Sequence, residues 1–310
     1  TNCRIVCNAG EPGGYALSPM GEGGGTGWGV ICDQSALVLS NCVVAQNTGG
    51  SGSGGSCTAG VGWDGGDGGN GGGLSVSGNS TVTVVNSVFT GNGPGGGGSG
   101  VYCNVRPGNS GAPGTGGGVL LSESTIAVTN CTLASNSFAI AGTMSGVSVR
   151  NSIVWNNGLA PGASVQYSSL SQAYPGTGNL AGDPKFIEMA GPYALRLAAD
   201  SRCLDAADNT ALSPDVLTDL DGENRFINAP AQDAGVPGGS GGTAIADMGA
   251  FERQLICIGD YNADGGVDGS DVQAFLSDWE SASPAADLNA NGGIDGEDVE
   301  VFFVRWESGC

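Results

Sequence analysis

The sequence predicts a mainly β protein, a right-handed parallel β-helix solenoid followed by a small α-helical C-terminal domain. Three observations lead to this prediction. An asparagine phrase recurs through residues 1–182, 39% of the 310 residues are hydrophobic although 60 are glycine, and the C-terminal region repeats one loop-and-helix pattern. High glycine content is typical of disordered chains. Here, however, the valines, isoleucines and leucines form ordered short runs, which favour a glycine-rich solenoid.

The asparagine phrase defines the repeat of residues 1–182. It begins at Asn41, Asn86, Asn130 and Asn151, which are 45, 44 and 21 positions apart. Each phrase continues with a small residue and an apolar pair, and a second asparagine follows six positions after the first. We therefore expect short stacked strands with inward apolar side chains and asparagines at corners, where they tolerate left-handed backbone and bond to the neighbouring turn. The alternative is an antiparallel β-sandwich, which does not require one corner residue at a fixed period.

Glycine-rich stretches at 49–73, 93–100 and 107–118 interrupt this pattern. They are too polar and too flexible to form a core, so we expect loops that leave one side of the solenoid. Such loops form a binding surface in one interpretation and low-contact spacers in the other, and the sequence leaves both open.

Residues 183–253 carry phrases of a different kind. Asp183-Pro-Lys-Phe186, Asp219-Leu-Asp-Gly-Glu-Asn-Arg225 and Asp247-Met-Gly-Ala-Phe-Glu252 occur in this order. Together with the repeats before them, they resemble secreted bacterial right-handed β-helix proteins of the choice-of-anchor, pectate-lyase-like kind, over most of residues 22–253. The resemblance implies that 183–253 form the last coils and cap the C-terminal end of the solenoid.

Residues 254–310 contain the calcium-loop spacing twice. Each copy has oxygen-bearing side chains at loop positions 1, 3, 5, 9 and 12 and a glycine at position 6, where the chain turns sharply around a hard cation. An amphipathic stretch with apolar residues on one helical face follows each loop. The predicted ligands of two Ca²⁺ ions are Asp260, Asn262, Asp264, Gly266, Asp268 and Asp271 in the first loop, and Asp287, Asn289, Asn291, Gly293, Asp295 and Asp298 in the second.

This region resembles a type I dockerin, a module built from two EF-hand-type loops. The resemblance implies that it folds around two calcium ions and docks onto a cohesin module. Aspartate at position 12 agrees with the family. Gly269-Ser270 and Gly296-Glu297, however, stand where cellulosomal dockerins usually carry a Ser/Thr contact pair. Calcium binding therefore carries over to this chain, whereas cohesin docking does not.

Composition limits the partners and the location. The net charge of −21 argues against nucleic acid and anionic membranes, and no apolar run of membrane-spanning length is present. Ten cysteines, an even and widely spread number, predict disulfides in an oxidising compartment. Cys257 and Cys310 bracket the calcium repeat, so we expect them to pair. We expect a secreted protein, extracellular or at the cell surface, whose signal peptide has been removed.

The sequence offers no convincing catalytic constellation. Between Asp67 and Asp183 the only acidic residue is Glu123, and the chain has no histidine, so a Ser-His-Asp triad is impossible. Asp64 and Asp67 could hold a cation or flank a sugar, and Trp28, Trp63 and Trp155 could stack on sugar rings. Incidental loop acids and ordinary packing are the simpler interpretations. For the acids of the closing segment (Asp205, Asp208, Asp219, Asp221 and Asp247) we expect turn and strand-end hydrogen bonds.

Two functions remain. The first is a structural or adhesive protein that assembles with copies of itself, or with a cohesin-like or other surface protein, through its calcium-bound module. The alternative is a protein that binds or degrades polysaccharide, in the manner of a lyase or glycosidase.

Overall fold

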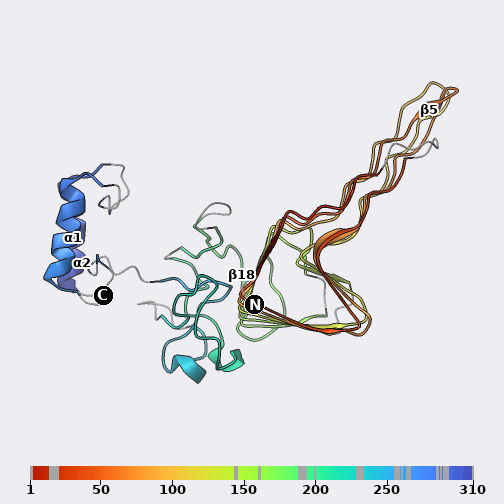
Figure 1. The fold of residues 1–310 in the computed structure, drawn as a ribbon. Coiled ribbons are helices and arrows are strands. Elements are labelled where there is room, and N and C mark those ends of the chain that lie inside the picture. Colours follow the sequence, from red (N-terminus) through yellow and green to blue (C-terminus); the bar gives the residue numbers. More distant parts are fainter. Residues whose placement is uncertain are drawn as a thin grey trace. The chain divides into compact units, whose positions relative to one another are not determined.

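The computed structural model describes most of the chain, and the chain divides into two compact units, Thr1–Arg253 and Gln254–Cys310. Each unit is described by itself (Figure 1). The described residues are 3–13, 21–142, 146–159, 162–187, 194–198, 200–227, 234–254, 259, 261–262, 267–283, 286, 288 and 293–308. No helix among them is long and apolar enough to cross a membrane.

The first unit is mostly β, with three parallel sheets and one short antiparallel hairpin. The seven-stranded sheet has the order β1 (Arg4–Val6), β4 (Val43–Ala45), β9 (Val88–Thr90), β12 (Thr132–Ala134), β15 (Ile153–Trp155), β17 (Ser169–Leu170), β18 (Leu180–Ala181). The four-stranded sheet has the order β13 (Ile140–Gly142), β10 (Val119–Leu121), β7 (Gly71–Ser77), β2 (Gly27–Asp33). The five-stranded sheet has the order β16 (Ser164–Gln166), β14 (Val147–Arg150), β11 (Thr125–Thr129), β8 (Thr81–Val85), β3 (Ala36–Ser40). The hairpin pairs β5 (Cys57–Thr58) with β6 (Val61–Gly62).

The chain visits the three sheets in turn, so that β2, β3 and β4 are followed by β7, β8 and β9. We call three such successive strands a rung. Val43 pairs with Val88, Val88 with Thr132, and Thr132 with Ile153. These registers reproduce the spacing of the asparagine phrases, and every pairing within the three sheets is parallel. The antiparallel sandwich is thereby excluded for this part of the chain.

The prediction of one right-handed β-helix solenoid is wrong. The structure contains three separate parallel sheets of seven, four and five strands rather than a single continuous coil. One reason is that residues 46–70 and 91–118 separate a strand of the seven-stranded sheet from the next strand of the four-stranded sheet. Another is that the chain turns between sheets at residues with positive φ, such as Gln34 and Asn41 (48° and 53°), which interrupt strand pairing.

Alternating apolar residues on the strands build the main core. In β8 and β11 the buried positions are every second residue, with Val82 and Val84 in one strand and Ile126 and Val128 in the next. Side chains alternate between the two faces of a strand. Since Val82 pairs with Ile126 and Val84 with Val128, the buried side chains of successive strands form a continuous apolar column. Burial of each such side chain contributes about 1.5–3 kcal/mol.

Both asparagines of the phrase have the roles expected from the sequence. The first ones, Asn41, Asn86, Asn130 and Asn151, have φ values of 53°, 46°, 49° and 49°. The second ones form a ladder of hydrogen bonds between rungs. Backbone N–H groups of Asn47 and Asn92 each donate at 3.0 Å to the side-chain oxygen of the next member, Asn92 and Asn136.

The glycine-rich stretches form an ordered structure that we call the glycine array, which ends at the β5 hairpin (Figure 1). It comprises outgoing segments 9–13, 48–56 and 93–101 and returning segments 21–27, 63–71 and 108–117. Neighbouring segments are joined by backbone hydrogen bonds at three-residue intervals, for example from Gly49, Gly52 and Gly55 to Gly93, Gly96 and Ser99. Other bonds join the two layers, as from Gly66 to Ser53. Three residues per turn is the repeat of a polyproline II helix.

The array needs glycine because its segments approach too closely for a side chain. A Cβ atom on Gly66 would lie 1.9 Å from the carbonyl oxygen of Glu22, and one on Gly95 would lie 1.9 Å from that of Gly50. These glycines are buried and donate backbone hydrogen bonds. Of the two interpretations that the sequence leaves open, low-contact spacers are therefore excluded for these segments.

Among the described cysteines the disulfide framework is smaller than the even cysteine count predicts. Cys57 of the β5 hairpin forms a disulfide with Cys103. Cys42 and Cys131 are buried thiols whose sulfurs lie 3.2 Å from the carbonyl oxygens of Ser40 and Thr129. Burial raises the pKa of the Cys131 thiol to about 12. The expected Cys257–Cys310 pair lies outside the described residues.

The docked segment, as we call residues 194–198, 200–227 and 234–253, lies against the outer face of the seven-stranded sheet. It contains two short 3₁₀ helices, η2 (Asn209–Ala211) and η3 (Gly239–Gly241). Leu195 and Phe251 pack with Val88 and Ala134, while Met248 packs with Ile153. We expected this region to cover the end of the stack, but these contacts run across its side. The reason is that β9, β12 and β15 present apolar side chains on both faces.

The second unit contains two helices, α1 (Gly269–Glu280) and α2 (Gly296–Ser308). Phe275, Ala286 and Phe302 are fully buried between them. The Phe275 and Phe302 rings are stacked, with centroids 4.3 Å apart and planes at 11°. The apolar helix faces expected from the sequence thus form one core.

Candidate functional site

The strongest candidate site lies where each C-terminal loop enters its helix. Asp268 Oδ1 accepts a hydrogen bond from Ser270 N at 2.7 Å, and Asp271 Oδ2 accepts one from Asp268 N at 2.8 Å. In the second loop Asp295 Oδ1 accepts from Glu297 N at 2.8 Å, and Asp298 Oδ2 accepts from Asp295 N at 2.9 Å. In both loops the position-9 N–H therefore holds the position-12 carboxylate, and in the first loop this bond is part of a capping box.

The two carboxylates at position 12 are buried. Their remaining oxygens face back into the loop, where Asp271 Oδ1 accepts from Asn262 N at 3.0 Å and Asp298 Oδ1 accepts from Leu288 N at 2.9 Å. Hydrogen bonds from the N–H groups of Asp268 and Asn262 hold the pKa of Asp271 below its usual value. A buried carboxylate that stays ionised requires N–H donors or a cation nearby.

Each tryptophan of the second unit donates a hydrogen bond to the loop that precedes the other helix. Trp279 of α1 donates from Nε1 to the carbonyl oxygen of Asp295, and Trp306 of α2 donates to that of Asp268, both at 2.9 Å. Tyr261 lies edge-on to both stacked phenylalanines. Its pKa is raised to about 12 by burial and by its bond to Asp278. The sequence indicates the tryptophans' helical face but not this reciprocal contact, because neither residue is near its partner loop in the chain.

Six of the twelve predicted ligands can be placed. Asp268 and Asp271 lie together at one helix start and Asp295 and Asp298 at the other, with Asn262 and Gly293 in the loops. The others, Asp260, Asp264, Gly266, Asp287, Asn289 and Asn291, lie outside the described residues. The placed carboxylate and amide oxygens are hard ligands of the kind that Ca²⁺ binds. The placed residues therefore have the chemistry that calcium ions require, and a bound ion would add binding free energy to the folding of its loop.

A second polar cluster is buried in the docked segment. One carboxylate oxygen each of Asp205, Asp247 and Glu252 lies within 4.8 Å of the others. Arg225 is fully buried beside them, donating from Nη2 to Asn86 Oδ1 at 2.9 Å and to the Gly249 carbonyl at 2.6 Å. Its Nη1 lies 3.8 Å from Glu252 Oε2. The guanidinium already supplies a cation to this cluster.

The acids of this cluster also bind main-chain N–H groups. Asp247 accepts from Asp205 N and Arg253 N, and Glu252 accepts from Asp247 N. Asp219 similarly accepts from three N–H groups, those of Asp221, Glu223 and Glu252. These are the turn and backbone hydrogen bonds expected from the sequence. They support a segment that has little regular secondary structure.

Burial dominates the titration of these groups. It raises the pKa of Asp247 to about 7 and that of Glu252 well above its ordinary value, and it lowers the pKa of Arg225. The arrangement stabilises the docked segment. Asp205, Asp247 and Glu252 are buried and do not line the groove beside this segment, so they are not presented to a substrate as a glycosidase pair would be.

Asp64 and Asp67 belong to the glycine array. Asp64 Oδ1 accepts from Asn109 N and Asp67 Oδ1 from Ala112 N, both at 2.7 Å. In the same way, Asn70 Oδ1 accepts a hydrogen bond from Thr115 N at 2.8 Å. These side chains connect two returning segments at three-residue intervals, which explains their spacing without a cation or a sugar.

The tryptophans of the first unit differ in surroundings. Trp155 packs against the docked segment. Trp63 is half-buried in the array, and its Nε1 is buried without a hydrogen-bond partner. Trp28 pairs along the backbone with Gly72 in β2 and β7. Packing therefore accounts for Trp155, whereas Trp28 and Trp63 remain partly accessible.

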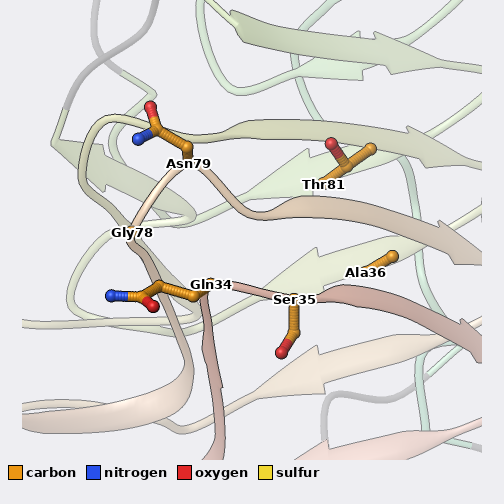
Figure 2. A pocket seen from close by; sticks show the side chains of 6 residues that line it. All are labelled: Gln34, Ser35, Ala36, Gly78, Asn79 and Thr81. Carbon is orange, nitrogen blue, oxygen red and sulfur yellow. The ribbon is translucent and has the colours of Figure 1, made fainter.

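Two surface depressions lie on the described part of the first unit. A pocket of about 590 Å³ lies at the corner between the four- and five-stranded sheets, and its lining residues are Gln34, Ser35, Ala36, Gly78, Asn79 and Thr81. Figure 2 shows the amide groups of Gln34 and Asn79 projecting from neighbouring turns. A groove of about 820 Å³ lies between the docked segment and strands β1, β4 and β9. Neither depression was expected from the sequence, because each combines residues of different rungs.

Comparison with known proteins identifies no relative. No protein-family model, no curated protein and no solved structure matches this chain.

Proposed function

We propose that this chain is an extracellular structural or adhesive protein, and that its C-terminal unit binds two calcium ions and contacts other proteins. The observation that carries the proposal is the matched geometry of the two loops. In each loop the buried carboxylate at position 12 accepts a hydrogen bond from a backbone N–H of the loop. In each loop, too, a backbone carbonyl accepts a hydrogen bond from the tryptophan of the other helix. The dockerin resemblance supports the same proposal.

The first unit supports a mechanical role. Its glycine array carries a disulfide and regular backbone hydrogen bonds. The buried acids of the docked segment bind backbone N–H groups and Arg225, which leaves them unsuited to acid-base chemistry on a substrate. The partner of the C-terminal unit would be another copy of the chain, or a cohesin-like or other surface protein.

Calcium titration of the full chain tests the proposal. We expect isothermal titration calorimetry to give two ions per chain, and about one ion for Asp298→Asn or Asp271→Asn. Glu280→Gln is the matched control, because it removes an exposed carboxylate from α1 outside the loop. Two ions bound by Asp298→Asn, or none bound by the wild-type chain in millimolar calcium, would contradict the proposal.

Removal of calcium provides a second readout. With EDTA we expect fast amide exchange in α1 and α2 but unchanged protection in β8 and β11, because the metal contributes folding free energy only to its own unit. Identical exchange in α1 and α2 with and without chelator would show that the unit folds independently of metal.

Polysaccharide binding remains the second candidate. The corner pocket of Figure 2 favours it, because uncharged amides and hydroxyls line that pocket and can bond to sugar hydroxyl groups. A polysaccharide pull-down with a reducing-sugar assay, alongside electron micrographs of the purified chain, separates the two functions. Filaments or sheets without sugar binding favour the structural role, and retention on one polysaccharide favours the alternative.

A further inference from the structure

The outer face of the seven-stranded sheet is only partly covered by the docked segment. Val88, Ala134 and Ile153, on β9, β12 and β15, pack beneath that segment. The corresponding face of β1 and β4 lines the groove of about 820 Å³, whose lining includes Arg4, Asn41, Val43, Ala45, Leu220 and Phe251. The groove therefore continues an interface that is already formed over the neighbouring strands.

A row of asparagines attaches the docked segment to this sheet. Asn86 Nδ2 donates to the Thr218 carbonyl at 2.6 Å, and Asn130 Nδ2 donates to the Asp247 carbonyl at 3.4 Å. Asn151 makes both kinds of bond with Asp208, donating to its carbonyl at 2.9 Å and accepting from its N–H at 2.8 Å. All three asparagines thus bind main-chain groups of an irregular segment.

Asn41 is the fourth member of this row and has no such partner among the described residues. It occupies the same position of the repeat and the same left-handed conformation, with φ 53°. It lines the groove. Its Oδ1 is buried, so no group that enters the groove reaches it, whereas its Nδ2 is accessible. The other three members donate from Nδ2 to a carbonyl oxygen of the docked segment, so Asn41 Nδ2 offers the same donor to a carbonyl group in the groove.

The charges of the groove indicate the chemistry of its occupant. Arg196 is paired with Asp221, with Nη2 and Oδ1 2.6 Å apart, and Asp219 is occupied by backbone N–H groups. Among the described residues Arg4 has no ion-pair partner, and it is exposed. Among the described residues the groove therefore offers a cation without an ion-pair partner at Arg4, an amide donor without an acceptor at Asn41, and apolar surface at Val43 and Ala45.

We propose that this groove binds an extended segment of a partner polypeptide, as a continuation of the docked segment. Asn41 Nδ2 donates to a main-chain carbonyl oxygen of the partner, small apolar side chains cover Val43 and Ala45, and an acidic side chain pairs with Arg4. A peptide is favoured over a sugar because every occupied asparagine of the row binds peptide main chain.

The stability of glycine variants gives the first test. Glycine tolerates the left-handed conformation, so Asn41→Gly removes only the side chain. We expect its thermal midpoint to equal that of the wild-type chain, while Asn86→Gly and Asn151→Gly each unfold several degrees lower. A loss for Asn41→Gly as large as that for Asn151→Gly would show that Asn41 already has a partner, and would overturn the proposal.

Peptide selection on the full chain gives the second test. The probe is a library of random dodecapeptides on phage, panned on the wild-type chain with counter-selection on Asn41→Gly. We expect selected peptides to contain an acid next to small apolar residues. Fluorescence anisotropy should show binding weakened at least about tenfold by Asn41→Gly and by Arg4→Glu. Asn79→Gly is the matched control, because Asn79 is also left-handed (φ 58°) but lines the other pocket (Figure 2).

Three results would overturn the proposal. The first is selection of no peptide, or of peptides that bind Asn41→Gly as tightly as the wild-type chain. The second is a concentration-dependent dimer that Asn41→Gly abolishes, which would assign the groove to a second copy. The third is polysaccharide binding that Asn41→Gly abolishes, which would assign it to a sugar.

Discussion

The sheet stack and the glycine array have the same repeat but are stabilised in different ways. In the sheets, apolar side chains such as Val84 and Val128 are buried between strands. In the array the buried residues are glycines, and backbone hydrogen bonds at three-residue intervals join the segments. The comparison shows that one repeat length can organise a side-chain core and an almost side-chain-free array in the same chain.

The two regions should therefore respond to opposite kinds of substitution. A sheet loses stability when atoms are removed from its core, because a cavity remains. The array loses stability when an atom is added, because the added group meets a neighbouring backbone.

Alanine at a buried glycine of the array should have the largest effect. In Gly95→Ala the new Cβ would lie 1.9 Å from the Gly50 carbonyl oxygen, whereas in Gly96→Ala it would meet nothing within 4 Å. We expect Gly95→Ala to cost at least about 3 kcal/mol of unfolding free energy, and Gly96→Ala to stay within about 0.5 kcal/mol of the wild-type value. Urea unfolding monitored by amide exchange of residues 93–117 measures both. Equal stability of the two variants would mean that the array is loosely packed.

Asn92→Ala tests the ladder that aligns the rungs. Asn92 Oδ1 accepts from Asn47 N and Asn47 Nδ2, and its own Nδ2 donates to the Val44 carbonyl at 2.9 Å. Removing the side chain leaves these buried groups unpaired, so we expect a loss of about 2–3 kcal/mol. Asn104→Ala, at an exposed position, should change the urea midpoint little. A similar midpoint for both variants would show that the sheets alone set the register.

A change of pH should alter the stability of the docked segment by less than Gly95→Ala or Asn92→Ala alters the stability of the first unit. Burial raises the pKa of Asp247 to about 7, so the folded state binds a proton more tightly than the unfolded state does. Stability is then greatest below the ordinary carboxyl pKa and falls as pH rises through about 7. Between pH 5 and pH 7 we expect a loss on the order of 1–2 kcal/mol.

Asp247→Asn identifies the source of this dependence. We expect this variant to flatten the fall in urea midpoint between pH 5 and pH 7, while Asp64→Asn, in the array, keeps the wild-type slope. A midpoint that rises over this range in the wild-type chain would contradict the assignment.

The sequence predicted those features that apolar spacing or a repeated side chain reveals. The asparagine phrases gave the positions of the left-handed corners and of the ladder, and the apolar phrases gave the strands around Val88 and Ile153. The path of the chain between sheets was not predicted, because apolar spacing does not show whether one strand continues into the next sheet. The array was missed because glycine carries no polarity signal, although Asp64-Gly-Gly-Asp67-Gly-Gly-Asn70 already has its three-residue period.

Contacts between residues that are distant in the chain were not predicted either. The 46-residue separation of Cys57 and Cys103 nearly equals the repeat length, and this signal could have identified the disulfide. No spacing in the sequence indicates the contact of Asn151 with Asp208 or that of Trp306 with Asp268. The two calcium loops could be proposed because their ligands are local in sequence.

Residue-resolved amide exchange in the array tests most directly whether backbone hydrogen bonds hold it together. In Asp64-Gly-Gly-Asp67-Gly-Gly, both glycines of each triplet donate backbone bonds, from Gly65 and Gly66 and again from Gly68 and Gly69, while Asp64 N and Asp67 N do not. NMR-detected exchange should therefore alternate with a period of three, slow at the four glycines and fast at the two aspartates. Uniformly fast exchange over residues 64–69 would contradict the account.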